Sequence, residues 1–186
     1  MQQGPAAQPP ATSPLLSLSV HPASGSGRPD PPDTIRAWLA SAHDVPTQAR
    51  AEWTTQKLAL LPLGRHFAAV RIPGAIVHAA VGTDDGQAIT HALETALPGP
   101  VIHDVRAVGP TYWALVPWRP GSRWRGPAET RYLGPGTYLG IPDIGCTEPP
   151  GSYWVTQPRY RRDLCHPEAV LSLIALGSHR LRSDPP

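Results

Sequence analysis

One stretch of the chain combines arginine with aromatic residues in the way that binding of single-stranded nucleic acid requires. Guanidinium groups bind phosphates, and flat aromatic rings stack on bases. The stretch runs from Trp118 to Arg131 and follows Tyr112 and Trp113. The alternative is that the aromatic rings pack a core and the arginines are solvated loop charges. The candidate nucleic-acid-binding residues are Arg65, Arg71, Trp118, Arg119, Arg123, Trp124, Arg125 and Arg131.

A second, smaller segment of the same type is Arg159–Tyr160–Arg161–Arg162. The basic residues of the chain are nearly all arginine, since Lys57 is the only lysine. Arginine suits bidentate contacts with phosphate, but abundant Pro, Gly and Ala favour a GC-rich genome as the simpler explanation. The net charge of +2 argues neither for nor against a nucleic-acid partner.

The rest of the sequence contains few recognisable motifs for catalysis or for binding a cofactor or a metal ion. No phosphate-binding glycine loop follows a predicted strand, so the sequence predicts no nucleotide cofactor of that kind. Cys146, Cys165 and His166 lack the paired short spacing of zinc ligands, so we expect two free thiols and no metal site. Four scattered histidines are interpreted as surface or core residues rather than catalysts: His66, His78, His91 and His103.

The composition divides the chain into one domain and two tails. Residues 1–32 hold eight of the 25 prolines and too few apolar residues to offset the entropy of ordering, so they are predicted to be disordered. The domain is predicted to span residues 33–177, and residues 178–186 are predicted to be a disordered C-terminal tail. With no signal peptide, no membrane span and no dense cysteine framework, a cytoplasmic location and no membrane partner are expected.

The domain is predicted to be α+β, with a mixed or antiparallel sheet flanked by helices. Apolar residues at helical spacing predict helices after a cap at Asp33, after Pro46, after a cap at Thr83 or Asp84, and from Pro167 to a stop at Gly177. Apolar runs between turn signals predict the strands, which are 58–62, 67–72 with a stop at Pro73-Gly74, 101–108, 112–117, 130–133, 137–141 and 152–155.

Several segments, taken in order, resemble the bifunctional DNA primase/polymerase N-terminal domain of the archaeo-eukaryotic primase superfamily. The segment Glu129-Thr-Arg-Tyr-Leu-Gly-Pro-Gly-Thr-Tyr-Leu-Gly-Ile-Pro142, followed by Gly151-Ser-Tyr-Trp154 and Pro158, resembles the end of that domain. Upstream, Leu60-Leu-Pro-Leu-Gly-Arg-His-Phe67 resembles a turn and strand of its diverged relatives. The resemblance covers about residues 33–177 and implies a primase-polymerase-like fold.

Active members of that family hold a divalent metal ion with carboxylates, commonly an Asp-x-Asp or Asp-x-Glu pair on one strand face plus a third acid. The matching strand here is 67–72, which contains no acid, and neither motif occurs anywhere in the chain. The family's Ser-x-His-like element would fall at Tyr112–Leu115, which has no histidine. The third acid would fall close to Arg131, where the nearest carboxylate is Glu129. If the resemblance is true, this chain is a pseudoenzyme.

Three functions therefore stay open. The first is a degenerate primase-polymerase-like protein that still binds single-stranded DNA or a nucleotide in a replication-related or regulatory role. The second is a structural or regulatory module that kept the fold for contacts with another protein. The third is an active nucleotidyltransferase with an unrecognised site, which would need a divalent metal and acids such as Asp84, Asp85, Asp104 or Glu129.

Overall fold

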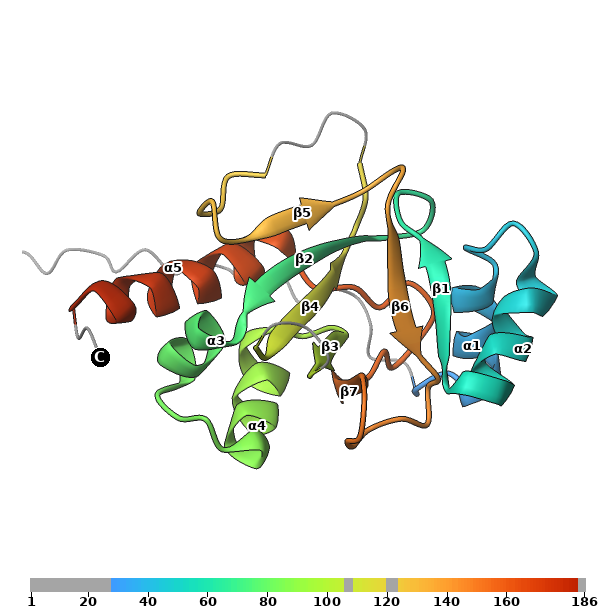
Figure 1. Ribbon diagram of the computed structural model, residues 1–186, viewed down its shortest axis with the longest axis horizontal. Helices are drawn as coiled ribbons and strands as arrows, with labels where there is room; N and C mark the ends of the chain where they lie inside the picture. Colours follow the sequence, from blue (N-terminus) through green and yellow to red (C-terminus); the bar gives the residue numbers. More distant parts are fainter. Residues whose placement is uncertain (1–27, 106–108, 120–123, 184–186) are drawn as a thin grey trace, which may run out of the picture.

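The computed structural model describes residues 28–105, 109–119 and 124–183, which form five helices and seven strands (Figure 1). The helices are α1 (Pro32–Ala40), α2 (Pro46–Gln56), α3 (Gly74–Val81), α4 (Gly86–Ala96) and α5 (Pro167–Ser183). The strands are β1 (Leu58–Pro62), β2 (Ala68–Pro73), β3 (Val101–Asp104), β4 (Thr111–Val116), β5 (Arg131–Leu133), β6 (Tyr138–Pro142) and β7 (Tyr153–Thr156). The predicted α+β class is confirmed.

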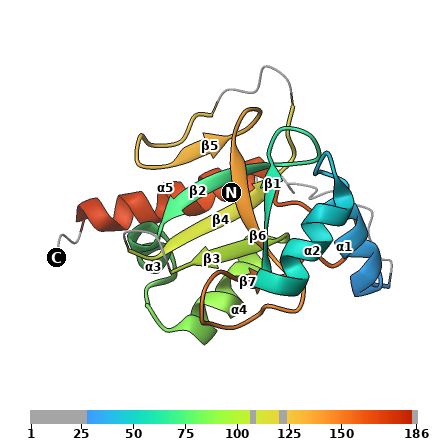
Figure 2. The same cartoon turned by 45° about the vertical axis from the view of Figure 1, so that its right-hand side comes forward.

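The strands form two sheets, and all pairings between described strands are antiparallel. The larger sheet has five strands in the order β5-β2-β4-β3-β7. The smaller one pairs β1 with β6 and is called the ribbon below. The chain passes from the ribbon to the large sheet between β1 and β2, and it returns between β5 and β6. Figure 2 shows the ribbon crossing in front of the large sheet, beside α1 and α2.

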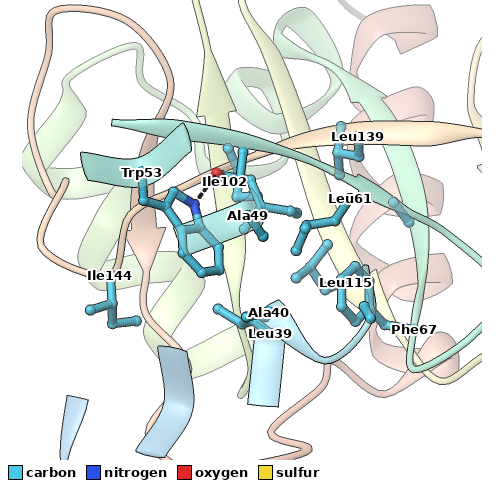
Figure 3. Close-up of a cluster of buried hydrophobic side chains, with 14 of the residues drawn as sticks. Leu39, Ala40, Ala49, Trp53, Leu61, Phe67, Ile102, Leu115, Leu139 and Ile144 are labelled. Carbon is cyan, nitrogen blue, oxygen red and sulfur yellow. Dashed lines mark hydrogen bonds between the residues drawn. The ribbon is translucent and has the colours of Figure 1, made fainter. Parts of the chain in front are cut away.

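Alternation along the strands divides the core into two layers, one on each side of the large sheet. On the side called the helical face, alternate residues of β2 such as Val70 and Ile72 pack against α3, α4 and α5. On the opposite side, called the ribbon face, residues such as Ala69 and Leu115 pack against the ribbon, α1 and α2 (Figure 3). In this second layer the buried Trp53 indole N–H donates to the Ile141 carbonyl at 2.9 Å and ties α2 to β6.

The predicted stop at Pro73-Gly74 is confirmed, because β2 ends at Pro73, but the sequence did not predict the helix that follows. Pro73 is the N-cap of this helix, α3, whose apolar residues cover β2. Gly177 was expected to stop the last helix, yet α5 continues to Ser183, so residues 178–183 are helix rather than tail. The reason is tertiary: a Cβ at Gly177 would lie 2.0 Å from the Ile76 carbonyl oxygen, so this glycine permits close packing of α5 on α3.

The boundaries of other elements differ by a few residues. Pro31, not Asp33, is the N-cap of α1, and the Asp33 carboxylate pairs with Arg36. Asp85 caps α4 by accepting the Ala88 N–H at 2.8 Å. The strand predicted for residues 101–108 ends at Asp104, and residues 106–108 lie outside the described residues.

The predicted N-terminal tail lies mostly outside the described residues, which begin at Arg28. Its last residues contact the domain. The Asp30 backbone N–H donates to the Arg159 carbonyl at 2.9 Å, and its carboxylate accepts from the Arg161 backbone N–H at 2.9 Å. The ordered part of the chain therefore begins before residue 33.

Candidate functional site

Two of the candidate arginines lie side by side in the large sheet. Arg71 of β2 and Arg131 of β5 are directly opposite each other in the antiparallel register. Both are on the ribbon face, because Val70 and Tyr132, their neighbours in sequence, pack into the helical layer. Arg131 is exposed and Arg71 is half-buried. We call these two residues the arginine pair.

The arginine pair has no acidic partner among the described residues. Within the described ranges, Arg71 donates one side-chain hydrogen bond, a long one of 3.5 Å to the hydroxyl of Thr111. Like charges on directly opposed strand positions destabilise a sheet. An anion held by both guanidinium groups would offset this repulsion.

The next strand adds Trp113 to the same row, because Trp113 of β4 is the register partner of Arg71 on the ribbon face. Its indole N–H is buried and has no acceptor among the described residues. Arg71, Trp113 and Arg131 therefore form one row across β4, β2 and β5 on the ribbon face.

The candidate tryptophans lie elsewhere. Trp118 and Trp124 are partly buried and pack against the core cluster of the helical face. The Trp124 ring stacks on Tyr132 with centroids 6.3 Å apart, and its N–H donates to the Thr130 hydroxyl at 3.0 Å. Both rings therefore pack against the core, which was the alternative to base stacking for the aromatic residues of this stretch.

The other candidate arginines do not join the arginine pair through any contact that the structure describes. Arg119 and Arg125 are exposed in the segment between β4 and β5. Arg65 follows β1 and is paired with Asp44 at 2.9 Å. Arg123 lies outside the described residues.

The acids considered for an enzyme do not gather at one place. Asp85 is the N-cap of α4, next to Asp84, and Asp104 is the last residue of β3. Glu129 is exposed and follows the segment of Arg125. Among the described residues no group of three His, Cys, Asp or Glu side chains is placed to hold a metal ion.

Both cysteines are free thiols in the described structure. Cys165 is buried against the Pro100 carbonyl, and its burial raises the pKa of the thiol to about 12. Burial also raises the pKa of the partly buried Cys146. Neither thiol is therefore activated as a nucleophile.

A cluster of four polar aromatic residues was missed at the level of sequence. His103 of β3 stacks on Tyr112 of β4 with ring centroids 4.5 Å apart, and its Nδ1 lies 2.8 Å from the Tyr153 hydroxyl. The Tyr112 hydroxyl is 3.3 Å from Nε2 of His78 on α3. Burial, followed by the charge of His78, lowers the pKa of His103, and its buried Nε2 has no partner among the described residues. These side chains come from four elements, so no spacing in the sequence indicates the cluster.

Comparisons with protein-family models, with curated proteins and with solved structures found no match. None of the described helices combines the length and the apolar character that a membrane span needs.

Proposed function

We propose that this chain binds nucleic acid or a nucleotide through phosphate groups held by the arginine pair, in a replication-related or regulatory role and without polymerising. The observation that carries the proposal is the direct opposition of Arg71 and Arg131 without an acidic partner among the described residues. A phosphate accepts bidentate hydrogen bonds from guanidinium groups, so one phosphate can satisfy both arginines.

The chemistry of this site favours binding that needs no metal ion. A guanidinium group is a donor without a lone pair to offer a cation, and it stays charged at all physiological pH values. The strand that would carry the metal-binding acids in the resembling family has Ala69 and Arg71 on this face. We therefore expect phosphate binding to persist in the presence of a chelator.

The placement of the tryptophans favours contacts with phosphate over contacts with bases. Trp118 and Trp124 pack in the helical layer, and Trp113 is partly buried against the ribbon layer. Without a free aromatic platform beside the arginines, recognition depends on backbone charge, which carries no sequence information. The ligand that fits is a nucleic-acid strand bound with little base preference, or the phosphate group of a nucleotide.

Fluorescence anisotropy with a labelled oligothymidylate at two salt concentrations tests the proposal. The affinity of the unmodified protein is expected to fall steeply with salt, because phosphate contacts release counterions. Arg71→Gln and Arg131→Gln are each expected to lower the affinity by about tenfold and to flatten its salt dependence. Arg50→Gln, at an exposed arginine of α2, is the matched control.

Two results would overturn the proposal. One is the absence of binding at low salt by the unmodified protein. The other is an equal loss of affinity in Arg50→Gln and in the variants of the arginine pair, because that result indicates general charge attraction rather than a site.

Primer extension separates a binding protein from a polymerase. We expect no extension with magnesium or with manganese, because two segments to which the resemblance assigns catalytic groups lack them: residues 67–72 contain no acid, and residues 112–115 contain no histidine. Extension that Glu129→Ala abolishes would establish an active nucleotidyltransferase and would contradict the proposed lack of polymerisation.

A second candidate function, contact with another protein, is favoured by the outer side of the ribbon. Leu60 of β1 and Tyr138 of β6 are large apolar side chains that are 54% and 58% exposed. Exposed apolar residues that cluster on one surface are typical of protein interfaces. Sedimentation velocity over a range of protein concentrations, with Leu60→Ser as the comparison, shows whether this surface mediates association between copies of the chain.

A further inference from the structure

A hollow of about 470 Å³ lies between the end of α3 and the last turn of α5, and we call it the α3–α5 hollow. The two helices pack against each other on the helical face, whereas the arginine pair is on the ribbon face (Figures 1 and 2). None of the described residues that line the hollow is acidic. The lining residues include His78, Gly82, Thr83, Arg180, Leu181 and Ser183.

Arg180 joins the two helices by binding the end of α3. Its Nη1 donates to the Ala79 carbonyl at 3.1 Å and to the Ala80 carbonyl at 3.0 Å, which uses both protons of that nitrogen. Carbonyl groups at the C-terminal end of a helix carry partial negative charge, so a cation is stabilised there. These two contacts hold the guanidinium group in place at the hollow.

The rest of the Arg180 guanidinium is available to a ligand. Three donor protons remain, one on Nε and two on Nη2. Arg180 has no acidic partner within the described ranges. The Nε–H and one Nη2–H point in parallel, and this edge of a guanidinium group matches the two oxygens of a carboxylate. Arg180 therefore offers a fixed positive charge and a bidentate donor to an anion in the hollow.

The turn after α3 adds a hydroxyl group to the same hollow. Gly82 ends the helix with a left-handed φ of 87°, and its N–H donates to the His78 carbonyl at 2.7 Å. The next residue, Thr83, lines the hollow. Its Oγ1 accepts from the Asp85 backbone N–H at 3.1 Å, so the hydroxyl proton is left for another acceptor. The hollow thus combines the donors of Arg180 with a neutral donor.

The charges and the apolar side chains of the hollow favour one class of anion. Arg180 supplies a single full positive charge, and the acidic residues Asp84 and Asp85 directly follow Thr83 in the chain. A group with one negative charge is therefore favoured over a dianion. Leu181 lines the hollow and is only partly buried against the helical core cluster. An apolar portion of the ligand would remove this side chain from water.

His78 connects the hollow to the cluster of polar aromatic residues. Its Nε2 lies 3.3 Å from the Tyr112 hydroxyl, and the Tyr112 ring stacks on His103 with centroids 4.5 Å apart. His78 therefore has one ring nitrogen in contact with the sheet, while the residue itself lines the hollow. A ligand in the hollow changes the surroundings of a ring whose signals can be followed by NMR.

We propose that the α3–α5 hollow binds a small organic carboxylate that has an apolar portion. The carboxylate accepts from Nε and Nη2 of Arg180 and from the Thr83 hydroxyl, and the apolar portion covers Leu181. Binding is non-covalent and makes or breaks no bond. The bound molecule connects the last turn of α5 to the turn after α3, which Arg180 already joins.

Benzoate and benzamide form a matched pair of probes, because both have a planar ring and only benzoate is charged. The His78 ring signals and the Gly82 amide signal would be followed by NMR while each probe is added to the full chain. Benzoate is expected to give saturable shifts with a Kd on the order of 1 mM, as suits so small a ligand. Benzamide is expected to give none. Absence of saturable shifts with benzoate, or equal shifts with both probes, would overturn the proposal.

Variants of Arg180 test the bidentate contact. Arg180→Gln is expected to weaken benzoate binding about tenfold, because the charge and the paired donors are lost. Arg180→Lys keeps a cation that can bind the α3 carbonyls but lacks the fork, and a loss of about fivefold is expected. Arg182→Gln is the matched control, since Arg182 is an exposed arginine of α5 that does not line the hollow. An equal loss in Arg182→Gln would indicate general charge attraction and would contradict the site.

Variants of Thr83 test the hydroxyl and leave the contacts of Arg180 with α3 in place. Thr83→Val has the same shape without the hydroxyl and is expected to weaken benzoate binding about fivefold. Thr83→Ser restores a hydroxyl and is expected to restore most of the affinity. Unchanged affinity in Thr83→Val would remove Thr83 from the site.

Sulfate tests the class of anion, because it is a tetrahedral dianion without an apolar portion. Weaker binding of sulfate than of benzoate is expected, and tighter binding of sulfate would overturn the assignment to a carboxylate. The inference does not rest on the arginine pair of the large sheet. Arg71→Gln is expected to leave the benzoate response unchanged while it lowers the affinity for oligothymidylate, so either proposal can fail alone.

Discussion

The two faces of the large sheet differ in the polar and charged side chains that they carry. On the helical face, uncharged aromatic side chains pack on one another: His103 on Tyr112, and Trp124 on Tyr132. His103 Nε2 and the Tyr132 hydroxyl are buried there without a partner among the described residues. On the ribbon face, two arginines oppose each other without an acid among the described residues. One face is therefore built from packed, uncharged side chains, whereas the other carries two opposed positive charges.

The strongest test of the packing role concerns Gly177. Gly177→Ala is expected to lower the free energy of unfolding by roughly 3 kcal/mol, because its Cβ would clash with the backbone of α3. Urea unfolding of the variant provides the measurement. Gly86→Ala is the matched control, since a Cβ there meets nothing within 4 Å. Equal stability of the two variants would contradict the close packing of α5 on α3.

A tryptophan on the helical face provides the next test. Trp124→Ala is expected to lower the unfolding free energy by about 2 kcal/mol, through lost burial and the lost hydrogen bond to Thr130. Its affinity for the oligonucleotide, measured under conditions where it is folded, is expected to stay unchanged. A large loss of affinity in the folded variant would instead assign Trp124 to the binding site.

Acid is expected to weaken the helical face through His103. Its pKa in the folded chain is lowered from 6.5, so the unfolded chain binds the proton more readily. The contribution of neutral His103 to stability is therefore complete above pH 6.5 and is lost as the pH falls through 6.5 towards the folded value. Urea unfolding at about pH 7.5 and about pH 5.5 measures this loss.

Burial also lowers the pKa of His66, so protonation of His66 contributes to the same loss of stability in acid. A variant of His103 is therefore needed to separate the two histidines. His103→Gln is expected to reduce the difference in stability between the two pH values, although it also loses the stack on Tyr112. An unchanged difference would show that other groups account for the acid sensitivity.

The smallest expected change in stability is also the most specific to the ribbon face. Arg131→Glu converts the like-charged pair into an opposite-charged pair and is expected to raise the unfolding free energy by about 0.5 kcal/mol at low salt. The same substitution is expected to reduce affinity for oligothymidylate. Stability and affinity that fall together would show that Arg131 stabilises the sheet rather than serving a ligand.

The sequence alone predicted the elements whose signals are local. The apolar run Leu58–Pro62 and the proline at Pro46 placed β1 and the start of α2 correctly. The prediction failed where a contact between residues far apart in the sequence determines the structure. Glycine commonly ends a helix, so Gly177 was expected to end α5. Its actual role is to allow close packing on Ile76 from within the helix.

For the candidate site, the sequence could indicate which residues to consider but not which of them lie together. Arg71 and Arg131 were both named as candidates, but their opposition depends on β5 pairing with β2 across a long separation in sequence. Strand alternation also separates Arg131 from Tyr132 and places them on opposite faces. The cluster of His78 and His103 depends on α3, which the Pro73-Gly74 signal concealed.

The junction between the ribbon and the large sheet has a mechanical consequence. The connections β1 to β2 and β5 to β6 run beside each other, and they touch so closely that a Cβ at Gly64 would lie 2.4 Å from the Pro135 ring. The Leu63 N–H also donates to the Thr137 carbonyl at 2.9 Å across this junction. Each strand that carries a member of the arginine pair therefore continues into one strand of the ribbon. The ribbon is thus joined through this junction to both strands that carry the arginine pair, so the ends of β2 and β5 nearest the ribbon are held together by contacts outside the large sheet.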